Sequence, residues 1–183
     1  RLILQGGGTD AATGLAFNGQ LEAPEGSIVL TPLTTLISKL VESDAAVDAA
    51  TAETMVKAAL GINSTEDLMT FDPIEAALSG GASVAAGIEI AREGVLVQNL
   101  VVQVSAAIRG ASDADMGSQD TMSWSIATSA TFDAIAFKIS TLETNVVLPE
   151  TVDLFEELIN GAAQFAGLST SAKIKLEASA DEI

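Results

Sequence analysis

The sequence predicts a mainly α-helical protein, a bundle of five to six helices with a β-hairpin at its N-terminus. Apolar residues recur at helical spacing through most of residues 31–183, and two cap-then-proline pairs mark helix starts. Turn-forming residues and short apolar runs occupy the first thirty positions. A chain of 183 residues is long enough for one domain and short for two. We therefore expect a single domain over 1–183, with a hairpin junction at 1–30 and a helical bundle at 31–183.

The composition favours helix packing. Hydrophobic residues make up 48% of the chain, aromatic residues only 4%, and tyrosine is absent. That content excludes intrinsic disorder. A core of small aliphatic side chains suits close helix–helix contact better than a β-sandwich.

The charge is strongly acidic. Twenty-five acidic residues against 8 basic ones give a net charge of -17. Such a surface repels nucleic acids and anionic lipids, so neither is expected as a partner. It is consistent with solubility in saline surroundings or with binding of divalent cations, which need clustered oxygen ligands.

The chain contains no cysteine and no histidine. Zinc or haem sites built on thiolate or imidazole are excluded, and so are Ser-His and Cys-His catalytic pairs. We therefore expect a protein that is not an enzyme.

We expect no segment to insert into a membrane. The most apolar run, Val95–Val104, is short and is interrupted by polar residues. The chain starts at Arg1 without methionine or a signal peptide, which suggests a mature form or a piece of a larger protein.

The pattern of the N-terminal region predicts strands and turns. Leu2–Gln5 is interpreted as the end of a strand shared with an upstream domain, broken by three glycines. Ala16–Ala23 and Ser27–Leu30, joined by a Pro-Glu-Gly turn, are predicted to form the hairpin.

Three helices should follow the hairpin. Thr31-Pro32 is a strong start signal, because threonine caps free N–H groups and proline at the first position has none. A second helix is expected from about Ala46 to Leu60, with an exposed Glu53–Lys57 pair. Asp72-Pro73 repeats the start signal for a short helix to Leu78.

The longest helix is predicted at about 82–109. It carries two apolar rows and only a narrow polar strip, which is typical of the middle of a bundle. We expect both rows to be buried. The first row is Val84, Ile88, Ala91, Val95 and Val102, and the second is Ile90, Val97, Val101, Val104 and Ile108.

The remaining chain should form a loop and two or three helices. Gly110–Asp120 is predicted as a loop, followed by a helix over Thr121–Leu142. Trp124 and the phenylalanines are assigned to the core, and a helix from about Leu148 should bury Phe155 and Phe165 among other residues. For 169–183 the pattern allows a strand around Ile174–Ala178 or a helix, and we favour the helix.

Two sequence blocks carry a resemblance to a known family. The first is GGGTDAATGLAFNGQLEAPEGSIVLTPLTTLISKL at 6–40, and the second includes Thr70-Phe71-Asp72-Pro73-Ile74. Over about 6–77, the chain resembles a helical module of large secreted bacterial surface proteins, the calcium-dependent adhesins and RTX-like proteins. The resemblance implies an extracellular or cell-surface location beside a β-rich domain and supplies no catalytic residue.

Four aspartates are candidate calcium ligands. Asp113, Asp115 and Asp120 lie in the predicted acidic loop, and Asp10 follows the three glycines. The spacing does not match an EF-hand, so a solvated loop and a capping role for Asp10 remain alternatives. Glu89 and Glu93 lie one turn apart on the long helix and are interpreted as a solvated or interface strip.

These observations favour a non-catalytic structural or adhesion module of a secreted or cell-surface bacterial protein. The alternative is a subunit that assembles into an extracellular filament or layer. In that case Leu2–Gln5 or Ile174–Ala178 would pair with a neighbouring subunit by strand addition. Partners would then be neighbouring domains or identical subunits.

Overall fold

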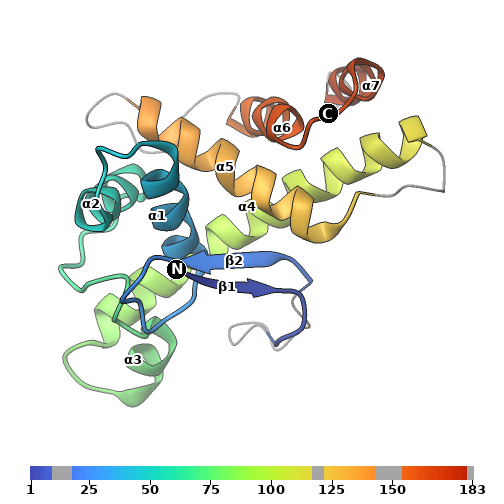
Figure 1. The fold of residues 1–183 in the computed structure, drawn as a ribbon. Helices are drawn as coiled ribbons and strands as arrows, with labels where there is room; N and C mark the ends of the chain where they lie inside the picture. The colour runs from blue at the N-terminus through green and yellow to red at the C-terminus, as the bar shows by residue number, and fades with distance from the viewer. Residues whose placement is uncertain (10–17, 117–121, 143–153, 181–183) are drawn as a thin grey trace.

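A computed structural model describes residues 1–9, 18–116, 122–142 and 154–180. It confirms a mainly helical fold with an N-terminal two-stranded antiparallel hairpin and a long central helix (Figure 1). α3 lies toward one end of α4, and α6 and α7 lie toward the other. The elements are β1 (Leu2–Gln5), β2 (Gln20–Ala23), α1 (Pro32–Ser43), α2 (Ala49–Leu60), α3 (Pro73–Ser79), α4 (Val84–Met116), α5 (Trp124–Thr141), α6 (Leu154–Phe165) and α7 (Thr170–Ala180).

The second strand of the hairpin lies within the predicted strand Ala16–Ala23, but its partner is Leu2–Gln5 and not Ser27–Leu30. β1 pairs with β2 in antiparallel register, Leu2 opposite Ala23 and Gln5 opposite Gln20. The prediction that Ser27–Leu30 is a strand was wrong. That segment is a connection whose Ile28 N–H donates to the Met69 carbonyl at 2.9 Å, so its backbone is held by the loop before α3.

The predicted helix starts at Thr31 and Asp72 are confirmed. Thr31 caps α1 in a capping box with Thr34, and Pro32 takes the first helical position. Asp72 accepts hydrogen bonds from two N–H groups at the start of α3. α2 begins three residues later than predicted, because Asp48 is its N-cap, and it ends at Gly61 with a φ of 68°.

Contrary to prediction, the Glu53–Lys57 pair is largely buried. The two charges lie 2.7 Å apart, with side chains 13% and 18% exposed. Each also bonds to the loop that follows α2: Glu53 accepts from the Leu68 N–H, and Lys57 donates to the Glu66 carbonyl. The pair therefore fastens this loop to α2.

α4 continues through Met116, so the prediction of a loop from Gly110 was wrong. Ala111 and Ser112 are buried, and α4 packs against α6 and α7. This packing outweighs the unfavourable helix propensity of one glycine, about 1 kcal/mol. The helix has 33 residues and a length of about 50 Å.

Only one of the two apolar rows of α4 is buried. Ile90, Val97, Val101, Val104 and Ile108 are all at most 3% exposed and face the core. The other row is largely exposed, contrary to prediction, with Ile88 at 56%, Val95 at 38% and Val102 at 45%. The core lies on one side of α4, where α5, α6 and α7 contact it, and this row faces away from it.

Contrary to prediction, the aromatic residues that the structure describes lie mostly outside the core. Phe132 is fully buried in α5, and Trp124 is half-buried under the Arg109 guanidinium, which lies 4.4 Å from the ring centroid. Phe137 and Phe165 are exposed and touch edge to face, with ring centroids 6.4 Å apart. Phe155 is exposed too, because α6 packs through Leu158, Ile159, Ala162 and Ala163.

The preferred helix at the C-terminus is confirmed. Residues 174–178 lie within α7, so the strand alternative for Ile174–Ala178 was wrong. Ala172 and Leu176 of α7 are buried and join the main core cluster.

Candidate functional site

A buried charged cluster ties the hairpin to the helices. Glu22 on β2 is only 1% exposed, and its Oε1 lies 3.0 Å from the Lys39 ammonium on α1. Lys39 also lies 3.3 Å from Asp133 Oδ1 and donates to the Ser129 hydroxyl at 2.9 Å, both on α5. The ammonium thus has three acceptors for its three protons.

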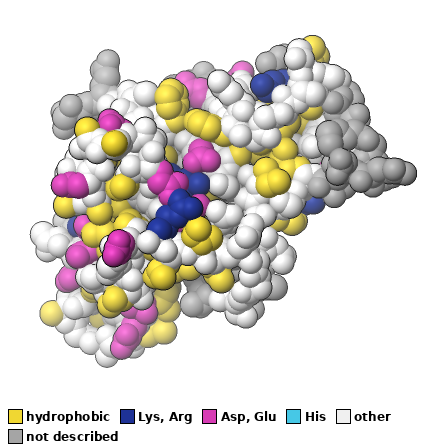
Figure 2. Space-filling model, viewed as in Figure 1, with side chains coloured by type: hydrophobic (Ala, Val, Ile, Leu, Met, Phe, Trp, Pro, Cys, Tyr) yellow, Lys and Arg dark blue, Asp and Glu magenta, His cyan; other side chains and the backbone are white. Residues whose placement is uncertain are grey.

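Arg1 extends this cluster to the surface. Its guanidinium lies 3.3 Å from Glu22 Oε2 and also pairs with Glu42 on α1. The Glu22 contact does not have hydrogen-bond geometry, so Oε2 is held by charge attraction alone. Figure 2 shows basic atoms flanked by acidic ones where the N-terminus lies in Figure 1. The cluster joins β1, β2, α1 and α5.

Burial raises the pKa of Asp133 above its ordinary value of 3.8. The nearby Lys39 ammonium opposes that shift by favouring the carboxylate, and the charge of Glu22 adds to it. Removing the Asp133 carboxylate from water therefore costs free energy, and the attraction to Lys39 offsets only part of that cost.

Threonines close the outer edge of β2. The Glu22 N–H donates to Thr35 Oγ1 at 3.0 Å, and the Gln20 N–H donates to Thr128 Oγ1 at 3.0 Å. The Thr35 hydroxyl also lies 3.1 Å from the Glu22 carbonyl oxygen. The N–H and C=O groups on this edge, which could otherwise pair with another strand, are thus satisfied by α1 and α5.

No described strand pairs with the outer edge of β1. The Gly6 N–H donates to the Gly19 carbonyl, and Leu4 is opposite Leu21, so the even-numbered residues of β1 face β2. The backbone groups of Ile3 and Gln5 consequently point outward. Among the described residues none bonds to them. Leu2 and Ile3 are each 51% exposed. This edge is the candidate interaction site.

The charged cluster was not predicted from the sequence. Its members come from elements far apart in the chain, and no local spacing links them. One signal was present: Lys39 is the only basic residue in the stretch 32–43 and lies among the apolar residues Leu36, Ile37 and Leu40. A lysine in such a position needs a buried partner.

The four candidate calcium ligands are not brought together in the described structure. Asp10 and Asp120 lie outside the described residues, as does the side chain of Asp115. Asp113 lies on α4 and not in a loop, and its Oδ1 is buried without a hydrogen-bond partner. Within the described ranges, no group of three acidic side chains is placed to hold a metal ion. Calcium binding stays a prediction.

Glu89 and Glu93 have separate roles. Glu93 is 5% exposed and pairs with Arg92 at 2.6 Å, so the prediction of a solvated strip was wrong for this residue. Glu89 accepts from the Asn63 N–H at 2.8 Å and ties the loop after α2 to α4. The two carboxylates therefore do not act as a pair.

One described helix is long and apolar enough to cross a membrane. It is α4 over Val84–Ala114, with mean hydropathy 1.2 in its most apolar window, of which 33% is buried. A single such helix is weak support for insertion, because core helices of soluble proteins pass the same test. The absence of membrane insertion stays a prediction.

Comparisons with protein-family models, with curated proteins and with solved structures found no match to this chain. The resemblance of residues 6–77 to modules of bacterial surface proteins therefore rests on its sequence motifs alone.

Proposed function

We propose that the chain is a non-catalytic structural or adhesion module of a secreted or cell-surface bacterial protein. Its N-terminal hairpin is the junction to a neighbouring β-rich domain or strand. The observation that carries this proposal is the contrast between the two edges of the hairpin. Threonines of the helical body close the β2 edge, whereas the outward groups of Ile3 and Gln5 on β1 bond to no described residue and can accept a partner strand.

The buried cluster supports the same role. A junction that transmits load must be fixed to the body behind it, and Glu22 and Lys39 fix β2 to α1. The net charge of -17 fits a protein exposed to saline surroundings. The motif resemblance at 6–77 adds the expected location.

Amide hydrogen exchange tests the junction. In the isolated chain, the Ile3 and Gln5 amides should exchange quickly, while the Leu4 amide is protected by its bond to β2. In the longer protein from the producing bacterium, all three should be protected. If Ile3 and Gln5 exchange equally fast in both forms, the junction role is wrong.

Proline substitution gives a matched pair of variants. Ile3→Pro removes an outward N–H and should leave the hairpin intact while preventing strand addition. Leu4→Pro removes a ladder bond and should loosen the hairpin itself. Equal effects of the two substitutions on stability would contradict the assignment of the outward edge.

Location is tested with antiserum against the purified chain. It should label intact cells of the producing bacterium or their culture medium. Labelling found only after cell lysis would overturn the surface location.

The filament alternative keeps one favourable observation, the open β1 edge. It predicts polymers of the purified chain in negative-stain images, lost in Ile3→Pro. A monomer at all protein concentrations would exclude it.

A further inference from the structure

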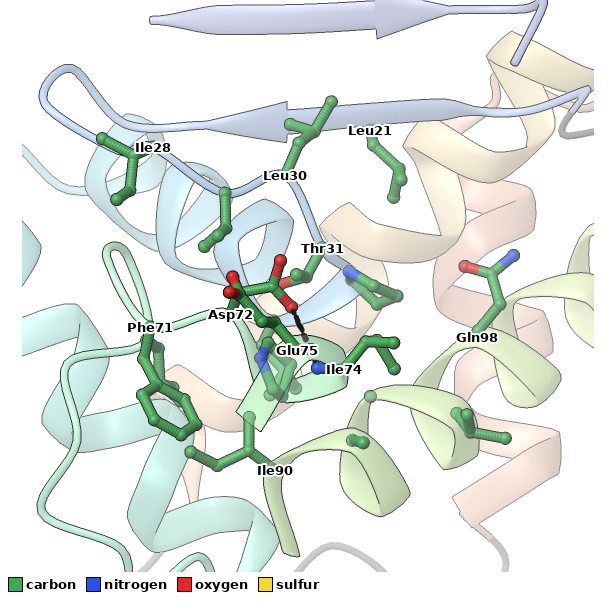
Figure 3. Close-up of a pocket in the computed structure, with 18 of the residues that line it drawn as sticks. Leu21, Ile28, Leu30, Thr31, Phe71, Asp72, Ile74, Glu75, Ile90 and Gln98 are labelled. Carbon is green, nitrogen blue, oxygen red and sulfur yellow. Dashed lines mark hydrogen bonds between the residues drawn. The ribbon is translucent and has the colours of Figure 1, made fainter. Parts of the chain in front are cut away.

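An open apolar pocket lies between α3, α4 and the connection from β2 to α1. It has a volume of about 630 Å³, which is in the range of ligand and side-chain binding pockets. Ile28 and Leu30 line it from the connection, Phe71 and Ile74 from the α3 region, and Ile90 from α4 (Figure 3). Val95 of α4 also lines it.

The pocket continues along α4 as an exposed apolar row. Ile88, Val95 and Val102 are spaced seven residues apart, and each is more than a third exposed. Fourteen residues of helix correspond to about 21 Å. The length and spacing match one face of a helix laid along α4, with apolar anchors every three or four residues.

Gly94 forms a gap in the pocket wall. A Cβ built at this position meets nothing within 4 Å, although the glycine lies in the middle of a helix. Glycine there costs about 1 kcal/mol relative to alanine. The open space it leaves can hold a partner's side chain.

Polar and acidic side chains accompany the apolar lining. The Oε1 of Gln98 is buried without a hydrogen-bond partner among the described residues, and Gln98 lines the pocket. Asp72 and Glu75 line it as well, and no described lysine or arginine forms an ion pair with either. The pocket is therefore mainly apolar, and it is acidic at its margin.

We propose that this pocket and the row along α4 bind a basic amphipathic helix of another protein. The apolar face of that helix would cover Ile88, Val95 and the space beside Gly94, and its lysines or arginines would approach Glu75. A second copy of this chain is the less suitable occupant, because it brings a net charge of -17 to an acidic margin. This inference does not depend on the proposed role of the hairpin.

A synthetic peptide tests the proposal. The probe is a fluorescein-labelled 14-residue Leu/Lys peptide with leucines at helical spacing, and its control has glutamate in place of lysine. Fluorescence anisotropy at physiological salt should show binding of the Leu/Lys peptide and at least tenfold weaker binding of the Leu/Glu peptide. Equal binding of the two would overturn the proposal.

Two matched glycine variants separate pocket binding from general charge attraction. Gly94→Leu fills the pocket, whereas Gly110→Leu adds the same side chain at another open position of α4, outside the pocket. Both should fold, as circular dichroism and melting temperature will show. Gly94→Leu should weaken peptide binding at least tenfold and Gly110→Leu should leave it unchanged. The same affinity in both variants would overturn the proposal.

A charge variant and a self-association control complete the test. Glu75→Gln should weaken Leu/Lys binding severalfold, whereas Glu156→Gln on the exposed surface of α6 should not. Dimers of the unmodified chain that disappear in Gly94→Leu would overturn the proposal in favour of a second copy as occupant.

Discussion

The ammonium of Lys39 lies 3.0 Å from Oε1 of Glu22, and both side chains are almost fully removed from solvent. This ion pair joins the second strand to the first helix. Removing two charges from water is costly, so such a pair adds little net stability compared with apolar residues. Removing Lys39 is a different matter, because Glu22 is then left buried with only the Arg1 guanidinium, 3.3 Å from its Oε2, to compensate its charge.

Lys39→Met should therefore destabilise the protein by about 3–5 kcal/mol, measured by urea unfolding. Lys138→Met is the control, since it breaks a more exposed pair with Glu157 and should cost at most about 1 kcal/mol. The double variant Glu22→Leu, Lys39→Met should recover much of the loss. Equal costs for Lys39→Met and Lys138→Met would show that the buried pair is unimportant.

The raised pKa of Asp133 predicts a pH dependence with a definite sign. The native state holds this proton more tightly than the unfolded state, so the contribution of Asp133 to stability declines as pH rises from about 3.8 through the raised native pKa. Asp133→Asn stays neutral. The melting temperature of the variant relative to that of the unmodified protein should be lowest well below pH 3.8 and should rise as the pH passes through the raised native pKa. A variant that becomes relatively less stable over this range would show that attraction to Lys39 outweighs burial.

Gly87 should tolerate no side chain. A Cβ there would lie 2.6 Å from the Ala77 nitrogen and 2.8 Å from the Pro73 carbonyl oxygen, both backbone atoms of α3. Gly87→Ala should therefore push α3 away from α4 and cost about 1–3 kcal/mol. Gly110→Ala, on the same helix but in open space, should instead stabilise by about 0.5–1 kcal/mol. Thermal unfolding of the two variants provides the comparison, and a stabilised Gly87→Ala would contradict the contact.

Calcium binding predicts a stabilisation that depends on free calcium. EGTA should lower the melting temperature, and Asp113→Asn should reduce that response, because its buried Oδ1 lacks another partner among the described residues. Magnesium at equal concentration is the control for ionic strength. An unchanged melting temperature in EGTA would rule out a calcium site that stabilises the fold.

Elements defined by local chemistry were predicted well from the sequence. The N-cap and proline at Thr31-Pro32 and at Asp72-Pro73 act on neighbouring N–H groups, so the start of each helix is encoded within a few residues. The hairpin depended on pairing residues 20–23 with residues 2–5 rather than with the nearer 27–30. Pairing at that distance is decided by the whole fold, and the propensities of both segments allow either choice.

Periodicity identified the two apolar rows of α4 but could not tell which one is covered. Both Val95 and Val97 belong to such rows, yet one faces away from the core and the other is buried. Burial depends on where α5, α6 and α7 pack, and this is tertiary information. The same reason explains Glu22, Lys39 and Asp133, whose proximity follows from the packing of β2, α1 and α5.

The two unequal edges of the hairpin also limit the stoichiometry of any assembly through it. Because Thr35 and Thr128 close the β2 edge, the described sheet can pair with only one further strand. Two copies that meet through β1 would satisfy each other around a two-fold axis and stop at a dimer. Continuous growth would require a donor segment in addition to this edge, whereas a single covalent neighbour would saturate it.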